Sequence, residues 1–174
     1  SDTGIFIGAF AMDMNVLQSS PFNRDSASSY STTGSGMTLL ANRLSYTFDF
    51  RGPSVAMDTA CSSSLVATHY ACQSLWNGEC SLALAGGCNA MLRPEYFVVM
   101  SKGKYLSPHS RCRTFDAGAD GYARGEGAGV VVLKPLQAAL QDKDPIYGLI
   151  RATGVNQDGQ TPGISLPSQA AQKS

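Results

Sequence analysis

Residues 54–65 read SVAMDTACSSSL, which predicts a short strand, a turn and the first residues of a helix. The apolar start of this stretch favours a strand, and the serines after Cys61 are good helix-capping residues. The helix is expected to begin at about Ser62 and to stop at Asn77-Gly78, because glycine tolerates the left-handed conformation that ends a helix. Cys61 therefore lies on a turn between a strand and a helix N-terminus.

Strands and helices alternate on both sides of this turn, which indicates an α/β layered architecture. Strands are expected at residues 4–8, 54–58, 81–85, 130–134 and 146–155, and helices at residues 37–48, 62–77, 94–101 and 135–142. The strands at 81–85 and 130–134 are apolar enough to be buried, and Gly86-Gly87 is expected to end the first of them. Residues 18–35, rich in Ser, Thr and Asn, predict a surface loop, with Thr33 or Ser35 capping the next helix. Within the helix at 62–77, one face is expected to pack against the sheet, the face that carries Leu65, His69, Cys72 and Trp76.

The composition excludes several classes of function. Of 174 residues, 43% are hydrophobic, which suits one globular domain or part of a larger one. Thirteen basic and thirteen acidic residues balance, and no basic cluster favours a nucleic-acid partner. Apolar runs are too short to span a membrane, and no signal peptide is visible, so a cytoplasmic protein is expected. The chain opens next to a strand and stops within an expected helix at 167–171, which predicts a domain truncated at both ends.

The cysteine pattern argues against a metal site and against a disulfide framework. Five cysteines are an odd number, and none forms a Cys-x-x-Cys pair. Reduced thiols are therefore expected. Cys72, Cys80 and Cys88 lie on or beside apolar elements and are interpreted as packing residues, and Cys112, in a loop between two arginines, as structural.

Cys61 is the candidate nucleophile, although a buried structural role is the commoner fate of cysteine. Only the thiolate is a good nucleophile, and a helix N-terminus favours the anion through its unpaired N–H groups and its dipole. The backbone N–H of Cys61 is expected to form part of an oxyanion hole. Ala60, Ser62 and Ser63 are small, so a substrate could approach the turn closely.

The two histidines do not supply a catalytic base. His69 is eight residues beyond Cys61, about 12 Å by helical rise, and is interpreted as a core residue. His109 lies in Ser107-Pro108-His109-Ser110 and is interpreted as a solvated loop residue. The glycines of residues 121–129 precede a strand, whereas a dinucleotide-binding loop follows one, so no bound cofactor is expected.

Several collinear motifs closely resemble the β-ketoacyl synthases of type I polyketide synthases. They cover nearly the whole chain and comprise residues 58–65 (DTACSSSL), 69–75 (HYACQSL), 84–87 (LAGG), 106–108 (LSP), 111–116 (RCRTFD), 120–127 (DGYARGEG) and 155–159 (VNQDG). The resemblance implies a thiolase-like αβαβα sandwich, of which residues 1–174 form mostly the N-terminal half.

The same resemblance implies a reaction. Cys61 would accept an acyl chain from the phosphopantetheine arm of an acyl carrier protein and extend it by decarboxylative Claisen condensation with a malonyl-type unit. It also implies a homodimer with neighbouring domains such as an acyltransferase. The family's two catalytic histidines lie beyond this chain, so the chain alone is expected to be inactive. A non-elongating acyl-relay ketosynthase and a fatty acid synthase ketosynthase remain open as alternatives.

Overall fold

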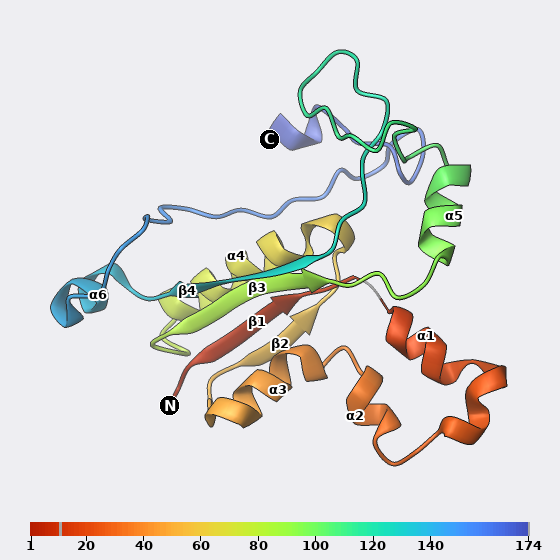
Figure 1. Cartoon of the computed structure of the whole chain (residues 1–174). Helices are drawn as coiled ribbons and strands as arrows, with labels where there is room; N and C mark the ends of the chain where they lie inside the picture. The colour runs from red at the N-terminus through yellow and green to blue at the C-terminus, as the bar shows by residue number, and fades with distance from the viewer. Residues whose placement is uncertain (11, 174) are drawn as a thin grey trace.

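The structure is a computed structural model that describes residues 1–10 and 12–173. Helices and strands alternate along most of the chain (Figure 1). In order, the elements are β1 (Gly4–Gly8), α1 (Asp13–Ser19), η1 (Pro21–Ser26), α2 (Ser31–Ser35), α3 (Leu39–Phe48), β2 (Ser54–Met57), η2 (Ala60–Ser62), α4 (Ser63–Trp76), β3 (Ala83–Asn89), α5 (Glu95–Lys102), β4 (Gly127–Leu133), α6 (Leu136–Asp142) and η3 (Ala171–Lys173), where η marks a 3-10 helix.

The strands form one four-stranded sheet in the order β2-β1-β3-β4. β1 pairs in parallel with β2 and β3, with Phe6 opposite both Val55 and Ala85, and β4 runs antiparallel to β3. The three parallel strands therefore end at the same edge of the sheet. In open α/β sheets this carboxyl edge is where ligands bind.

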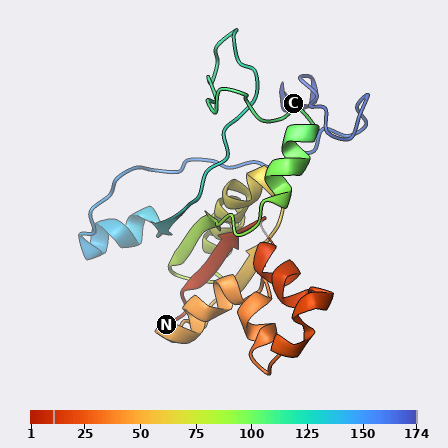
Figure 2. The same ribbon diagram turned by 45° about the vertical axis from the view of Figure 1, so that its right-hand side comes forward.

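Helices cover both faces of the sheet, as Figures 1 and 2 show. On one face, Phe6 of β1 packs with Ala67 and Ala71 of α4. On the other face, Ile5 and Ile7 pack with Ala41 of α3. Successive side chains of a strand point to opposite faces, so one strand supplies both cores. This arrangement confirms the predicted α/β layers.

The buried face of α4 differs from the predicted one. Leu65 and Trp76 are exposed, and only Cys72 of the four predicted residues is buried. The residues that the sheet covers are small instead, with Ala67 and Ala71 fully buried. Small side chains let the helix approach the strands closely. Since α4 carries apolar residues around most of its circumference, periodicity alone could not identify its buried face.

Four further expectations about elements were wrong. Residues 18–35 contain α2, η1 and the end of α1 rather than one loop, and no side chain caps α3. Residues 146–155 form no strand but run back as an extended segment on the α4 side of the sheet (Figures 1 and 2). β4 is a strand as predicted, but it lies at the sheet edge with Val130, Val131 and Val132 at least half exposed.

β3 continues through Gly86 and Gly87 instead of ending there. A Cβ on Gly86 would overlap the carbonyl oxygen of Gly129 in the neighbouring strand. A Cβ on Gly87 would lie 2.9 Å from the carbonyl oxygen of Gly8. The glycine pair therefore allows the backbones of β4 and β1 to approach β3 closely, at the end of the sheet that carries the candidate site.

Candidate active site

Cys61 lies at the carboxyl edge of the sheet, in the 3-10 turn between β2 and α4. It is exposed to solvent, as a nucleophile must be. It is the second residue of this turn, a position whose N–H group has no acceptor within the turn itself. The thiol and the candidate oxyanion donor, both of Cys61, thus lie two residues before α4 begins at Ser63.

The turn is held in an unusual backbone conformation. Ala60 has a φ of 56°, in the left-handed region that non-glycine residues seldom occupy. Its N–H donates to Asp58 Oδ1 at 2.8 Å, and its carbonyl oxygen accepts from Ser63 Oγ at 2.6 Å. These two bonds fix both sides of the residue that precedes Cys61. Strained conformations of this kind persist only where the surroundings enforce them.

The serines after Cys61 support the turn instead of capping α4. Ser63 is 4% exposed, and its Oγ accepts from the Thr59 N–H at 2.9 Å while it donates to Ala60. Ser62 is exposed, and its Oγ donates to the Thr59 carbonyl oxygen at 2.9 Å. Ser62 stands at the N-cap position of α4 but makes no side-chain capping bond. The expected capping role was therefore wrong.

Ser63→Ala should loosen the turn far more than Ser62→Ala. The change leaves the Thr59 N–H without its buried acceptor and removes one of the two donors to the Ala60 carbonyl, which keeps the backbone N–H of Ser63. The loss costs about 1–3 kcal/mol of unfolding free energy. Ser62 is exposed, so its replacement should cost about 0.5 kcal/mol or less. Urea unfolding of both variants tests this, together with the rate at which iodoacetamide alkylates Cys61. Equal losses of unfolding free energy in the two variants would contradict the role assigned to Ser63 in holding the turn.

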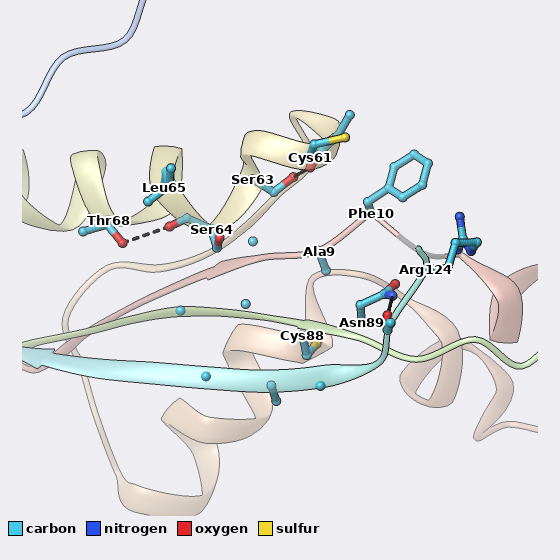
Figure 3. A pocket seen from close by; sticks show the side chains of 18 of the residues that line it. Ala9, Phe10, Cys61, Ser63, Ser64, Leu65, Thr68, Cys88, Asn89 and Arg124 are labelled. Carbon is cyan, nitrogen blue, oxygen red and sulfur yellow. Dashed lines mark hydrogen bonds between the residues drawn. The ribbon is translucent and has the colours of Figure 1, made fainter. Parts of the chain in front are cut away.

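A cavity of about 870 Å³ opens beside Cys61 at the carboxyl edge of the sheet (Figure 3). The ends of β1 and β3, the N-terminus of α4 and the segment before β4 form its walls. The lining side chains are mostly small or apolar, with Phe10, Leu65, Asn89 and Arg124 among the larger ones. Pockets of this size and lining hold organic ligands, and the few polar groups orient them.

Close backbone packing brings α4 to this cavity. A Cβ on Gly8, the last residue of β1, would lie 2.5 Å from the carbonyl oxygen of Ser63 and even closer to other backbone atoms of α4. A Cβ on Gly87 would lie 2.9 Å from the Cβ of Ser64. Two glycines from neighbouring strands thus let the helix N-terminus approach the sheet. The strand-like pattern around Gly8 gave no sign of this contact in the sequence.

The other cysteines lie in different surroundings. Cys72 and Cys80 are buried as predicted, and burial raises the pKa of the Cys72 thiol above its ordinary value. Cys88 is exposed and lines the cavity, so its interpretation as a packing residue was wrong. Cys112 is exposed, and its Sγ accepts from the Ala123 N–H at 3.3 Å, a contact between two loops.

Neither histidine lines the cavity. His69 is only half-buried, and its Nδ1 lies 2.8 Å from Thr153 Oγ1 in the extended segment. It is therefore hydrogen-bonded, as expected of a structural histidine, but it is not a core residue. The side chain of His109 is 64% exposed, and its Nε2 lies 3.8 Å from Asp120 Oδ2. Its place in an open loop agrees with the prediction.

The loop that carries His109 is tied to Asp120. The Ser107 hydroxyl donates to Asp120 Oδ1 at 2.6 Å, and this bond is the main reason why the pKa of Asp120 lies below its ordinary 3.8. Partial burial opposes this shift, and the charges of Arg113 and His109 add to it. Ser107 also accepts from the His109 N–H at 3.2 Å. One buried hydroxyl thus connects both ends of the loop.

The loop is expected to open in acid. Because the folded pKa of Asp120 is lowered, its stabilisation is fully present above pH 3.8 and is lost as the pH falls through the lowered value. After correction for the intrinsic pH dependence of amide exchange, the protection of residues 107–122, measured by hydrogen exchange and mass spectrometry between pH 3 and 6, should fall at the acid end. Ser107→Ala should raise the exchange rate near neutral pH as well. Unchanged exchange in that variant would contradict this role of Ser107.

The structure was also searched for metal sites and for membrane-spanning helices. Within residues 1–10 and 12–173, the acidic, histidine and cysteine side chains form no group of three that could hold a metal ion. In the same part of the chain, no helix is both long and apolar enough to cross a membrane.

Sequence reasoning missed the larger side chains around the cavity. Asn89 donates through Nδ2 to the Gly125 carbonyl oxygen at 2.6 Å and so joins β3 to the segment before β4. Arg124 stacks on Tyr96 and Phe97 of α5. Of these side chains, only Arg124 could have been noticed in the sequence, because it is the lone cation within the glycine-rich residues 121–129.

Comparison with known proteins agrees with the resemblance noted in the sequence. Residues 1–139 match the family described as "Beta-ketoacyl synthase, N-terminal domain". The chain is 52% identical over 172 residues to reducing polyketide synthase 8 of Fusarium mangiferae, covering 99% of this chain and 7% of that protein. It is 50% identical over 174 residues to a polyketide synthase-nonribosomal peptide synthetase of Aspergillus clavatus, covering 99% of this chain and 4% of the relative.

Solved structures agree as well. The chain matches an oxazolomycin ketosynthase domain of Streptomyces albus with a TM-score of 0.89 and 41% identity, covering 98% of this chain and 29% of that one. It matches the module 6 ketosynthase of the Bacillus subtilis bacillaene synthase with a TM-score of 0.87 and 40% identity, covering 98% of this chain and 28% of the other. These matches confirm the thiolase-like α/β fold expected from the motifs. The chain therefore belongs to the β-ketoacyl synthase family and carries its N-terminal domain.

Proposed function

We propose that this chain is part of a polyketide synthase ketosynthase, with Cys61 as its acyl-accepting nucleophile. The observation that carries the proposal is the exposed Cys61 on a strained turn at the mouth of an 870 Å³ cavity. The family match and the polyketide synthases among its relatives support the same reading.

The reaction would proceed in two covalent stages. The Cys61 thiolate attacks the carbonyl carbon of an acyl thioester on the phosphopantetheine arm of an acyl carrier protein. The carbon–sulfur bond of that thioester breaks, and the arm leaves as a thiolate, which takes up a proton equivalent to the one that the Cys61 thiol lost. In the second stage a malonyl-type thioester loses carbon dioxide, and its enolate carbon attacks the acyl-Cys61 carbonyl. The new carbon–carbon bond gives a β-ketoacyl thioester, and the Cys61 thiolate is released.

The turn before α4 supplies what the first stage needs. Attack on the thioester carbonyl places negative charge on its oxygen, and in this proposal the backbone N–H of Cys61 donates a hydrogen bond to that oxygen. The hydrogen bonds to Ala60 hold this N–H in a fixed position, so little reorganisation is needed as the charge develops. In this proposal, phosphopantetheine reaches the site as part of the substrate, and the chain binds no cofactor or metal of its own.

Residues 1–174 are proposed to be the N-terminal part of the ketosynthase domain. The chain spans about 29% of the solved ketosynthase chain it matches and about 7% of the curated relative. Apolar side chains remain exposed on α4, β4 and the segment at 146–155, including Leu65, Trp76, Val132, Leu149 and Val155. Exposed apolar surfaces of this kind are usually covered by further protein. The rest of the domain is proposed to cover them and to supply the catalytic histidines, so the chain alone would not catalyse condensation.

The partners follow from the same proposal. The complete enzyme is expected to be a cytoplasmic homodimer that works with an acyl carrier protein and a neighbouring acyltransferase domain. No nucleic acid or membrane takes part. The alternatives, a non-elongating acyl-relay domain and a fatty acid synthase domain, would use Cys61 in the same acylation step.

The test is to map the acyl adduct on the complete enzyme. After incubation with an acyl-carrier-protein thioester, peptide mass spectrometry is expected to find the acyl group on Cys61. The other exposed thiols, Cys88 and Cys112, serve as internal controls and should stay unmodified. An adduct on either of them, with Cys61 free, would refute the assignment. Formation of a β-ketoacyl product on adding a malonyl thioester separates elongation from acyl relay.

A further inference from the structure

Two side chains of the cavity wall at the Cys61 end are joined through α5. Phe10 follows the end of β1, Arg124 precedes β4, and both line the cavity (Figure 3). The ring of Tyr96 in α5 packs edge-to-face against Phe10, with the ring centroids 5.3 Å apart. The central carbon of the Arg124 guanidinium lies 5.4 Å from the centroid of the same Tyr96 ring. The position of α5 therefore sets the position of this wall, which we call the Phe10–Arg124 wall.

The connection that leads from β3 into α5 is held by a side chain of α1. Its residues, 90–94, form neither helix nor strand. Backbone N–H groups in such a connection need acceptors from elsewhere when water does not reach them. Asp13 Oδ2 accepts from the N–H of Leu92 at 2.9 Å and from the N–H of Arg93 at 3.0 Å. One carboxylate oxygen thus fixes two consecutive residues of the connection.

Asp13 is the stronger of two carboxylates that hold this connection. Glu126 also contributes, since its Oε1 accepts from the Met91 N–H at 2.6 Å, but its side chain is exposed and competes with water. Asp13 is only 6% exposed. A buried carboxylate is tolerated where hydrogen bonds compensate its lost hydration, and hydrogen bonds to a charged acceptor are about twice as strong as neutral ones. The tie between α1 and the connection therefore depends chiefly on Asp13.

We infer that Asp13 is a positioning residue, which fixes the Phe10–Arg124 wall beside Cys61 through the connection and α5. The inference rests on the function proposed above, in which this wall contacts the acyl thioester that Cys61 attacks. Asp13 itself does not line the cavity, so it acts only through the residues that it holds.

The Cys61 turn is held by a separate set of bonds. Asp58 and Ser63 fix its backbone, and their hydrogen bonds involve neither α1 nor residues 90–94. Release of α5 should therefore move the wall and leave the thiol in place. Contacts that a substrate makes equally before and during the reaction affect the half-saturating concentration and not the maximal rate. Loss of Asp13 is thus expected to weaken binding of the thioester without slowing the attack.

The experiment measures acylation of Cys61 in the complete synthase over a range of concentrations of an acyl-carrier-protein thioester. Asp13→Ala should raise the half-saturating concentration about tenfold, the lower end of the loss expected for hydrogen bonds to a charged group. The maximal rate per folded enzyme should stay close to that of the wild type. Asp13→Asn keeps a carbonyl acceptor but not the charge, so its half-saturating concentration should rise only about threefold. This milder variant also provides the test if Asp13→Ala does not fold.

Asp25→Ala is the matched control, because Asp25 is an exposed acidic residue in the neighbouring η1. It should leave both kinetic quantities unchanged. A lower maximal rate at an unchanged half-saturating concentration in the Asp13 variants would overturn the inference, and so would wild-type values of both. Hydrogen exchange tests the tie without reference to the reaction, since residues 91–102 should lose protection in Asp13→Ala and keep it in Asp25→Ala. If the wild type is not acylated at Cys61, the proposed function itself fails.

Discussion

Cys61→Ala is expected to abolish acyl transfer and condensation in the complete enzyme. Removal of the nucleophile eliminates the covalent stage, and removal of a nucleophile in other enzymes lowers turnover by about a millionfold. No other thiol can substitute, because Cys72 and Cys80 are buried and Cys112 does not line the cavity. Cys88 lines the cavity but lies in β3, outside the turn that precedes α4. Residual product should fall to the background of the assay.

The measurement is product formation together with peptide mapping of the acylated enzyme. Cys88→Ala is the matched control, since it removes the other cavity thiol and leaves the turn intact. It should remain acylated at Cys61. A Cys61→Ala enzyme that still forms a β-ketoacyl product would remove Cys61 from the mechanism. The site would then have to be sought elsewhere in the synthase.

Gly8→Ala is expected to disable the enzyme without touching a reacting atom. The added methyl would overlap the backbone of Ser63 and Ser64, and backbone cannot move aside as a flexible side chain can. The first turn of α4 would therefore shift, together with Cys61 on the preceding residues. Overpacking in a core costs about 1–3 kcal/mol of unfolding free energy. A displacement of about 1 Å at a reacting group lowers the rate by about a hundredfold.

The two effects can be measured separately. Urea unfolding gives the stability, and the rate of Cys61 acylation in the folded variant gives the loss of alignment. Gly148→Ala is the matched control, because a Cβ there meets no atom within 4 Å. It should leave both quantities close to those of the wild type. A Gly8→Ala enzyme with normal acylation would show that the close approach of β1 to α4 does not position Cys61.

Local patterns predicted most of the secondary structure. β1, α4 and α6 lie close to where periodicity and turn residues placed them, and β2 ends just before the turn that carries Cys61. The left-handed Gly78, with a φ of 71°, follows the end of α4 as expected. These features depend on neighbours in sequence, such as a helix stop or an alternating strand. Short-range information is therefore sufficient for them.

Features that depend on distant neighbours could not be predicted in the same way. Residues 146–155 have the composition of a strand, but a strand needs a partner for its backbone N–H and C=O groups, and the described residues offer none. The buried face of α4 depends on which side the sheet covers. The sheet covers small residues of α4 such as Ala67, and it leaves larger ones such as Trp76 exposed.

The candidate site shows the same division. The sequence identified Cys61 as the candidate nucleophile through a turn motif, and it excluded His69 as the catalytic base by its distance along the helix. It gave no indication that Gly8, over fifty residues earlier, contacts the first turn of α4, or that Arg124, over sixty residues later, lines the same cavity. Contacts across such separations arise only when strands pair and helices pack.

The sequence by itself therefore determined the proposed nucleophile, a cysteine on a strand–turn–helix, because reactive groups and local backbone shape are encoded by adjacent residues. The tertiary structure alone decided the surroundings of that cysteine. Parallel pairing of β1, β2 and β3 brings three chain segments to one edge of the sheet, and the cavity forms where they meet. No single segment contains the shape of the cavity, because that shape depends on the distances between the segments.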